Sequence, residues 1–278
     1  MSAALDWDRA APRWSAGARV GVALIVATAL LALFAPVIAP VPPGRLDLAA
    51  SWLPPSRAHP FGTGDNGVDV LANVAYGARV SLGVGLAAVF LSGLFGTAVG
   101  MAAAWAGGLW DDAAMRVIDV LLAFPGLLLA IFITAVIGPS LGGLLLALCA
   151  TAWVSYARLA RAQVLSLQQR EFVLAARALG ASPLRIAVRH LLPNLAGPLV
   201  VQATFGLPGV ILAEAALSFL GLGVPPGTPS WGALVDQGTA HLLDAPHVAL
   251  FPGAAIAVAT LGFNFLGDAL RDRLDPRR

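Results

Sequence analysis

The sequence predicts an all-α integral membrane protein with six transmembrane helices. Of its 278 residues, 58% are hydrophobic and only 12% are charged, and the mean hydropathy is +0.82. So little charged surface cannot keep a chain of this length dissolved in water. A hydrocarbon core about 30 Å thick is crossed by about 20 helical residues, and the chain contains several uncharged windows of at least that length.

Five uncharged windows contain the expected spans, and the third is long enough for two helices. The segment "IGPSLGG" at 137–143 interrupts that window with glycines and a proline. The segment "GLGVPPGTPSWG" at 221–232 is also uncharged, but it cannot satisfy its own backbone hydrogen bonds in lipid, so we expect it to be external. The six expected spans are 20–44, 80–110, 120–137, 141–157, 191–213 and 245–267.

The first span is longer than the about 7–15 apolar residues of a secretory signal peptide, so we expect it to remain as an anchor. This gives three parts. Residues 1–45 hold a cytoplasmic N-terminus and the first helix, 46–79 an external segment, and 80–278 a five-helix core. Within the core we expect a cytoplasmic loop at 158–194 and an external loop at 215–246.

The basic residues predict the orientation in the membrane. All 17 are arginines, and only Arg45, Arg57 and Arg79 fall on one side of the expected spans. The positive-inside rule places the other side, with both termini and residues 158–190, in the cytoplasm. Tryptophans, which favour membrane interfaces, fall near the expected cytoplasmic borders: Trp14, Trp105, Trp110 and Trp153.

The chain shows no means of driving transport or catalysis by itself. A phosphate-binding P-loop needs the lysine of GxxxxGK[ST], and the chain has no lysine. The four histidines are scattered, and the cluster of His241, Asp244 and His247 contains Pro246, which breaks the helix that would align metal ligands. We therefore expect a polar external loop there, with a metal site as the less favoured alternative.

Few polar residues lie within the expected spans. Gln202, Glu214 and Asn264 are the candidates for a translocation path, with a buried structural hydrogen bond as the alternative for Gln202 and Glu214. Pro208 is the candidate hinge, because a proline inside a helix frees a backbone carbonyl and bends it. On the second span, small residues recur every four positions and permit close helix packing: Ser92, Gly96, Gly100 and Ala104.

The expected cytoplasmic loop contains a break between two helices. The stretch 157–179 is rich in helix formers, and Gly180 suits the left-handed residue that follows a helix. Ser182 is a good N-cap for a second helix, and Pro183 suits its first position. We expect this second helix to end before Pro193.

The second helix has two different faces. We expect one face to pack on the protein's own helices and the other, basic with one isoleucine, to dock onto a partner protein. The alternative for the basic face is a surface lying on anionic lipid. The inner face comprises Leu184, Ala187, Val188 and Leu191, and the docking face comprises Arg185, Ile186, Arg189 and His190.

The loop resembles the cytoplasmic signature of ABC importer permeases, in which EAA is followed by three residues, Gly, nine residues and I-x-L-P. The segment "LAARALGASPLRIAVRHLLP" matches it, with the spacing intact, at Ala175, Ala176, Gly180, Leu192 and Pro193.

Two departures, Leu174 for the glutamate and His190 for the isoleucine, point to a subfamily. "REFVLAARALGAS", "RHLLPN" and "ALSFLGLGVPPGTPSWG" resemble the C-type permease subunits of dipeptide, oligopeptide and nickel importers, and the likeness covers nearly the whole chain. The segment "HPFGTGDNGVDVLANVAYGARVSLGVG" is similar too, except at Gly64, Val68 and Asn73, where the pattern usually has Asp, Arg and Arg.

The resemblance implies the type I ABC importer permease fold, with one N-terminal helix added to a five-helix core and a cytoplasmic coupling helix. It also implies the partners: a homologous permease subunit, one or two kinds of ATP-binding subunit that bind ATP and Mg²⁺, and an external solute-binding protein. The expected location is the bacterial cytoplasmic (inner) membrane. No nucleic acid is expected, because the arginines are dispersed along the membrane borders.

We accordingly expect a non-catalytic permease subunit that holds no cofactor and imports dipeptides or oligopeptides by alternating access. Glu214 is the candidate to meet a peptide ammonium, with the buried structural hydrogen bond as its favoured interpretation. An ion-coupled secondary carrier or a membrane scaffold is the alternative function, and a nickel complex or another small solute the alternative cargo. The expected ATPase-coupling residues are Ala175, Ala176, Gly180, Ser182, Pro183, Arg185, Ile186, Arg189, His190 and Pro193.

Overall fold

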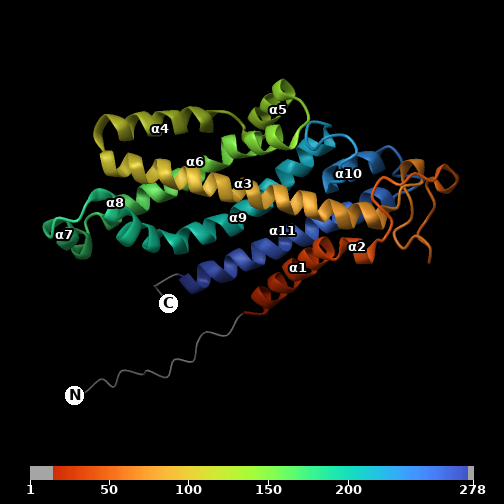
Figure 1. Cartoon of the computed structure of the whole chain (residues 1–278), viewed down its shortest axis with the longest axis horizontal. Helices are drawn as coiled ribbons and strands as arrows, with labels where there is room; N and C mark the ends of the chain where they lie inside the picture. Colours follow the sequence, from red (N-terminus) through yellow and green to blue (C-terminus); the bar gives the residue numbers. More distant parts are fainter. Residues whose placement is uncertain (1–14, 275–278) are drawn as a thin grey trace, which may run out of the picture.

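The computed structural model describes residues 15–274 and shows a bundle of long helices (Figure 1). Within the described part, five helices are long and apolar enough to cross a membrane, or six if a bent pair counts as one span. The expected fold class is confirmed. The five are α1 (Ala16–Leu33), α3 (Val70–Ala106), α6 (Leu141–Leu167), the continuous helix Pro183–Phe219, which contains α8 and α9 (Leu192–Phe219), and α11 (His247–Leu274).

The predictions made for Trp14 and for the first and last arginines concern positions outside the described residues. The first span differs from the expected 20–44, because α1 ends at Leu33 and is followed by the single turn α2 (Ala35–Ile38). Proline at the start of α2 and at 40, 42 and 43 prevents the helix from continuing to 44.

The second span begins ten residues earlier than expected, at Val70 rather than 80, and Asp69 caps it by accepting from the N–H of Ala72 at 2.8 Å. Arg79 therefore lies inside α3. Its guanidinium donates to the carbonyl oxygens of Ala32 (2.5 Å) and Leu33 (2.9 Å) at the end of α1. A cation at the carbonyl end of a helix is stabilising, which explains why this arginine is tolerated in the helix.

The third expected span, 120–137, is not one helix. It is divided between α4 (Gly108–Ala123) and α5 (Gly126–Ile137), which meet at an angle of 88°. Phe124 has extended backbone angles, as a residue before a proline prefers, and Pro125 begins the new direction. Hydropathy alone does not report such a break, because the residues on both sides are equally apolar.

The small residues of α3 permit a close helix contact, as predicted. A Cβ atom added at Gly96 would overlap the backbone oxygen of Trp153, and one added at Gly100 would overlap that of Ala157. The backbones of α3 and α6 thus approach each other directly along this seam.

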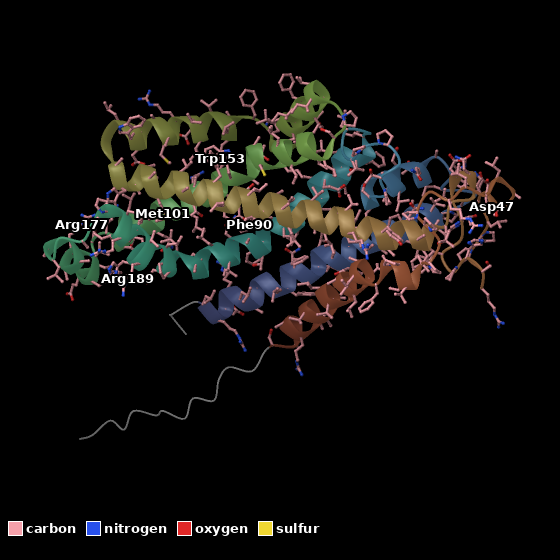
Figure 2. The ribbon with its side chains drawn as sticks, viewed as in Figure 1. Asp47, Phe90, Met101, Trp153, Arg177 and Arg189 are labelled. Atoms are coloured by element: carbon pink, nitrogen blue, oxygen red, sulfur yellow. The ribbon has the colours of Figure 1, made fainter. Side chains whose placement is uncertain are left out.

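The two ends of the bundle differ in character. Figure 2 shows Arg177 and Arg189 at one end and Asp47 at the other. The end with Asp47 carries the turns η1 (Leu48–Ala50) and η2 (Asp65–Gly67) and the helix α10 (Trp231–Thr239), so the expected loop 215–246 contains a helix. Trp231 holds α10 on the bundle: its side chain is buried and its Nε1 donates to the carbonyl of Val74 at 3.0 Å.

Candidate functional site

The arginine-rich end is built by a loop between α6 and α9. The expected helix over 157–179 is split, because α6 ends at Leu167 and the short helix α7 (Glu171–Ala178) follows a turn. The turn lets α7 fold back and bury Val173 and Ala176, and this burial outweighs the helix propensity of residues 168–170.

Gly180 ends α7 as predicted. Its φ angle is +79°, its N–H donates to the carbonyl of Arg177 at 2.9 Å, and the N–H of Ala181 donates to that of Ala176 at 3.0 Å. These two bonds form a Schellman motif, which requires a left-handed residue. The predicted left-handed position of Gly180 is confirmed.

The next helix begins as predicted but does not end as predicted. Ser182 accepts from the N–H of Arg185 at 3.4 Å and Pro183 occupies the first turn of α8 (Pro183–Ile186). A π-turn over Ala187–Leu191 then joins α8 to α9. Pro193 lies in the first turn of α9, where the preceding π-turn requires no hydrogen bond from residue 193, so the lack of an N–H is tolerated. The expected end of the helix before Pro193 is therefore wrong.

The loop is anchored by an apolar cluster. Ile186 and Leu191 are each 1% exposed and pack with Val173, Ala176 and residues of α3, α6 and α9. The assignment of Ile186 to the docking face is therefore wrong. The expected inner face is also corrected, because Leu184 is 74% and Val188 57% exposed. The burial of Val173 and Ala176 on α7 supplies the apolar cover over Ile186, and the pattern of the second helix alone does not show it.

Two residues outside the expected coupling set attach the loop to α3. Arg177 stacks on Trp105 of α3, with its Cζ 4.6 Å from the ring centroid, and Gln168 donates to the carbonyl of Ala104 at 3.1 Å. Both contacts tie the loop to α3. The exposed members of the set are Ala175, Gly180, Ser182, Pro183, Arg185, Arg189 and Pro193, with His190 half-buried.

Four exposed side chains project from the loop and are here called the tip surface: Leu179, Leu184, Arg185 and Arg189. Leu179 is 87% exposed, and the two arginines are exposed and have no acidic partner among the described residues. Two exposed leucines and two guanidinium groups from the same loop suit a partner with apolar pockets and carboxylates.

An apolar groove of about 960 Å³ runs between α3 and the α8–α9 helix. Leu184 and Val188 line the groove at its arginine-rich end, and Phe90 and Met101 line it from α3 (Figure 2). The groove contains almost no polar side chain, which fits contact with lipid or with another apolar surface.

The three candidates for the translocation path do not converge. Gln202 is half-buried on α9 and Asn264 is exposed on α11. Glu214 is 0% exposed, and its Oε1 accepts from the hydroxyl of Ser218 at 2.8 Å. For Glu214 the structure thus contains the structural hydrogen bond that was the alternative. The two histidines of the expected metal cluster have separate partners: the tilted rings of His241 and Trp52 have centroids 3.9 Å apart, and the Nε2 of His247 lies 3.1 Å from the carbonyl oxygen of Thr63.

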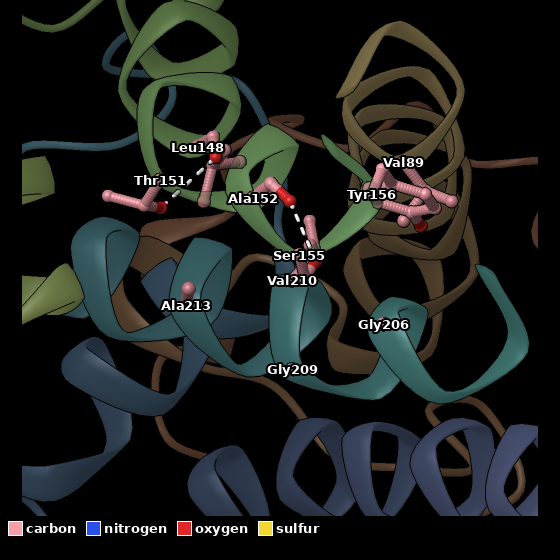
Figure 3. A pocket seen from close by; sticks show the side chains of 10 residues that line it. All are labelled: Val89, Leu148, Thr151, Ala152, Ser155, Tyr156, Gly206, Gly209, Val210 and Ala213. Atoms are coloured by element: carbon pink, nitrogen blue, oxygen red, sulfur yellow. Dashed lines mark hydrogen bonds between the residues drawn. The ribbon is translucent and has the colours of Figure 1, made fainter. Parts of the chain in front are cut away.

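A central cavity of about 240 Å³ lies between α3, α6 and α9 and was not predicted from the sequence (Figure 3). Thr151, Ser155 and Tyr156 on α6 face Gly206 and Gly209 on α9. Its signal was present in the sequence: three hydroxyl side chains lie within six residues of an apolar helix, and two of them, Thr151 and Ser155, are one turn apart on the same face.

Comparison with known proteins agrees with this architecture. Residues 96–278 match the family described as "Binding-protein-dependent transport system inner membrane component". A protein of Brucella suis, provisionally named a peptide transport system permease, is 46% identical over 259 residues, which cover 93% of this chain and 87% of that protein. The dipeptide transport system permease protein DppC of Alkalihalophilus pseudofirmus is 42% identical over 258 residues, covering 93% and 85%. The oligopeptide transport system permease protein OppC of Bacillus subtilis is 39% identical over 260 residues, covering 94% and 85%.

The fold is similar to that of a chain in inward-facing structures of the MetNI methionine ABC transporter. The TM-score is 0.53 at 21% sequence identity, and the match covers 69% of this chain and 94% of that chain. The predicted type I importer permease fold is thereby confirmed. The family match covers residues 96–278, and the relatives are similar to this chain over nearly its whole length. The chain therefore belongs to the binding-protein-dependent transport system inner membrane components and is a non-catalytic, multi-pass permease subunit.

Proposed function

We propose that this chain pairs with a homologous permease subunit to form the translocation path of an ATP-driven importer of dipeptides or oligopeptides. The cargo class is supported by relatives named as peptide, dipeptide and oligopeptide permeases. ATP and Mg²⁺ bind to one or two kinds of separate ATPase subunit, and this chain holds no cofactor. The absence of lysine supports this division, because a P-loop requires one.

The coupling role rests on the structure of the loop, which is packed against the bundle on one side and exposed on the other. Ile186 and Leu191 bury their side chains against α3, α6 and α9, while the tip surface projects away from the bundle. A partner that binds the tip surface and moves it also displaces α3, α6 and α9, to which the loop is anchored. Closure of two ATPase subunits then converts the path between inward-open and outward-open states.

We place the arginine-rich end, and with it both termini, in the cytoplasm of a bacterium. Most of the arginines belong to this side of the predicted topology: Arg116, all six arginines of 158–190, Arg271 and Arg273. The positive-inside rule therefore supports a cytoplasmic location for this end. The opposite end, formed by residues 39–69 and α10, then faces the external solute-binding protein.

The test is co-purification of the ATPase subunits with the permease pair, together with ATP-driven uptake of tri-alanine in reconstituted vesicles. Leu179→Asp places a charge on the tip surface and is expected to lose both ATPase binding and uptake. Leu243→Asp is the matched control for ATPase binding, because Leu243 is 98% exposed at the opposite end of the bundle. Uptake that depends on an ion gradient and not on ATP would instead support an ion-coupled carrier. Normal ATPase binding by Leu179→Asp would show that the tip surface is not part of the interface.

A further inference from the structure

The central cavity contains a buried hydroxyl that nothing in the chain explains. Tyr156 is 3% exposed, and among the described residues its Oη has no hydrogen-bond partner. A buried hydroxyl without a partner is destabilising, and phenylalanine would fill the same space without that cost. The hydroxyl is therefore best explained by a partner that enters the cavity from outside the chain.

The facing helix has glycine where it passes close to that hydroxyl. In Figure 3 the ring of Tyr156 lies above Gly206, and a Cβ atom added at Gly206 would stand 3.2 Å from the Tyr156 Oη. Gly209 has nothing within 4 Å of such an atom. The α9 wall of the cavity thus carries no side chain at either glycine, and Gly206 is the one that lies next to the hydroxyl.

The rest of the lining indicates the chemistry of the ligand. The hydroxyls of Thr151 and Ser155 donate to the carbonyls of Leu148 (3.2 Å) and Ala152 (3.0 Å) in their own helix, and their oxygens retain lone pairs that accept. No charged side chain lines the cavity, so a charged chain end would be left without a counter-ion there. Donors and acceptors without charge suit the N–H and C=O of a backbone amide.

The size of the cavity limits how much of a ligand it holds. Pockets that enclose a whole small molecule occupy about 300–1,000 Å³, and this cavity has about 240 Å³. It takes one segment of an extended chain rather than an entire peptide. Such partial, uncharged contact suits a conduit, where a cargo must bind weakly enough to leave.

We propose that the central cavity is a contact site on the translocation path, at which Tyr156 hydrogen-bonds a backbone amide of a passing peptide. This inference rests on the proposed function. Thr151 and Ser155 add acceptors for the peptide N–H, and Gly206 leaves no side chain on the α9 side of the Tyr156 hydroxyl.

The first experiment uses the complete complex, with both permeases, ATPases and binding protein, in vesicles supplied with tri-alanine. Tyr156→Phe is expected to lower the maximal uptake rate about three- to tenfold, as for the loss of one neutral hydrogen bond, while its thermal stability is unchanged or higher. Gly206→Ala is expected to lower uptake similarly in the wild type and to have no further effect in Tyr156→Phe. Gly83→Ala is the control, since an added Cβ there meets nothing within 4 Å. Unchanged uptake by Tyr156→Phe overturns the proposal, and so does a loss of stability that accounts for the slower uptake.

The second experiment separates this inference from the proposed function. The only cysteine is Cys149, so Cys149→Ala with Ser155→Cys carries a single thiol in the cavity. We expect a small hydrophilic thiol reagent to label it, and tri-alanine during turnover to slow that labelling. If vesicles take up tri-alanine but the thiol is never labelled, or is labelled equally with and without peptide, the complex is a peptide importer and the cavity is not on its path.

Discussion

Arg161 on α6 and Asp111 on α4 form a two-point ion pair, in which Nε and Nη2 of the arginine donate to the two carboxylate oxygens at 2.6 Å each. The pair joins the start of α4, just after two glycines with positive φ, to the arginine-rich half of α6. Planar two-point pairs of this kind are stronger and more specific in geometry than single contacts. Together with the buried Ile118, the pair holds the bent α4–α5 unit against the bundle.

Asp111→Ala and Arg161→Ala are each expected to lower the stability of the purified protein in detergent. A hydrogen bond to a charged group contributes about 1.5–3 kcal/mol, and the exposure of the two side chains, 13% and 31%, places the effect near the lower end. The double variant is expected to be little worse than either single one, as measured by thermal unfolding. Arg158→Ala, on an exposed residue of the same helix, serves as the control; fully additive losses would show that the two residues do not interact.

Gly180→Val is expected to disrupt the loop, whereas Gly180→Asn is expected to be tolerated. An added Cβ meets nothing within 4 Å, so the effect comes from the backbone: a left-handed residue with a side chain costs roughly 1–2 kcal/mol, and asparagine adopts this conformation more readily. Co-purification of the ATPase subunits measures the outcome. Equal ATPase binding by the valine and asparagine variants would mean that the turn at Gly180 does not set the position of α8.

Ile186→Ala is expected to lower stability by about 2–5 kcal/mol, because it removes a buried side chain and leaves a cavity. Leu184→Ala, on the same helix and 74% exposed, is expected to leave the unfolding temperature unchanged. Hydrogen exchange in the loop region can localise the effect to residues 171–195. Equal unfolding temperatures for the two variants would contradict the buried position of Ile186.

Pro208→Ala is expected to stabilise α9 and to slow uptake. Proline inside a helix costs about 3 kcal/mol, and alanine restores an N–H that can bond the carbonyl of Thr204. Pro208 is buried inside α9, and its role as a hinge is still a prediction. The measurement is tri-alanine uptake against ATP hydrolysis in reconstituted vesicles. A variant that transports at the wild-type rate would show that switching needs no bending at this position.

The orientation can be tested with single cysteines in a Cys149→Ala background. Arg185→Cys is expected to react only with reagents that reach the cytoplasm, and Leu53→Cys, at an exposed position of the opposite end, only with reagents added outside intact cells. Labelling of residue 185 from outside would reverse the topology.

The parts of the fold that sequence predicted well are those set by local chemistry. Positive φ at Gly180 and the cap at Ser182 follow from backbone conformation and one hydroxyl, and the close contact at Gly96 follows from the absence of a side chain. The gathering of arginines at one end follows from membrane electrostatics. None of these requires knowledge of which distant residues meet.

The parts that were missed depend on tertiary contacts. Ile186 is buried because α7 folds back over it and a π-turn rotates the following residues, and neither is visible in the pattern of its own helix. The cavity at Tyr156 exists because α6 and α9 meet there with glycine on one side. The proline at 125 was a sequence signal for the bend, but the uniform hydropathy of 120–137 indicated a single span instead.

The π-turn at Ala187–Leu191 makes Pro183–Phe219 one uninterrupted helix of 37 residues. At about 1.5 Å per residue this rod is roughly 55 Å long, well beyond the about 30 Å of the hydrocarbon core. A tilt of about 5° about one end displaces the other by roughly 5 Å. The rod therefore connects the tip surface to Glu214 and α10 mechanically: a tilt at one end is transmitted to the other, reduced only by the compliance that the π-turn and the prolines at 193, 198 and 208 introduce along its length.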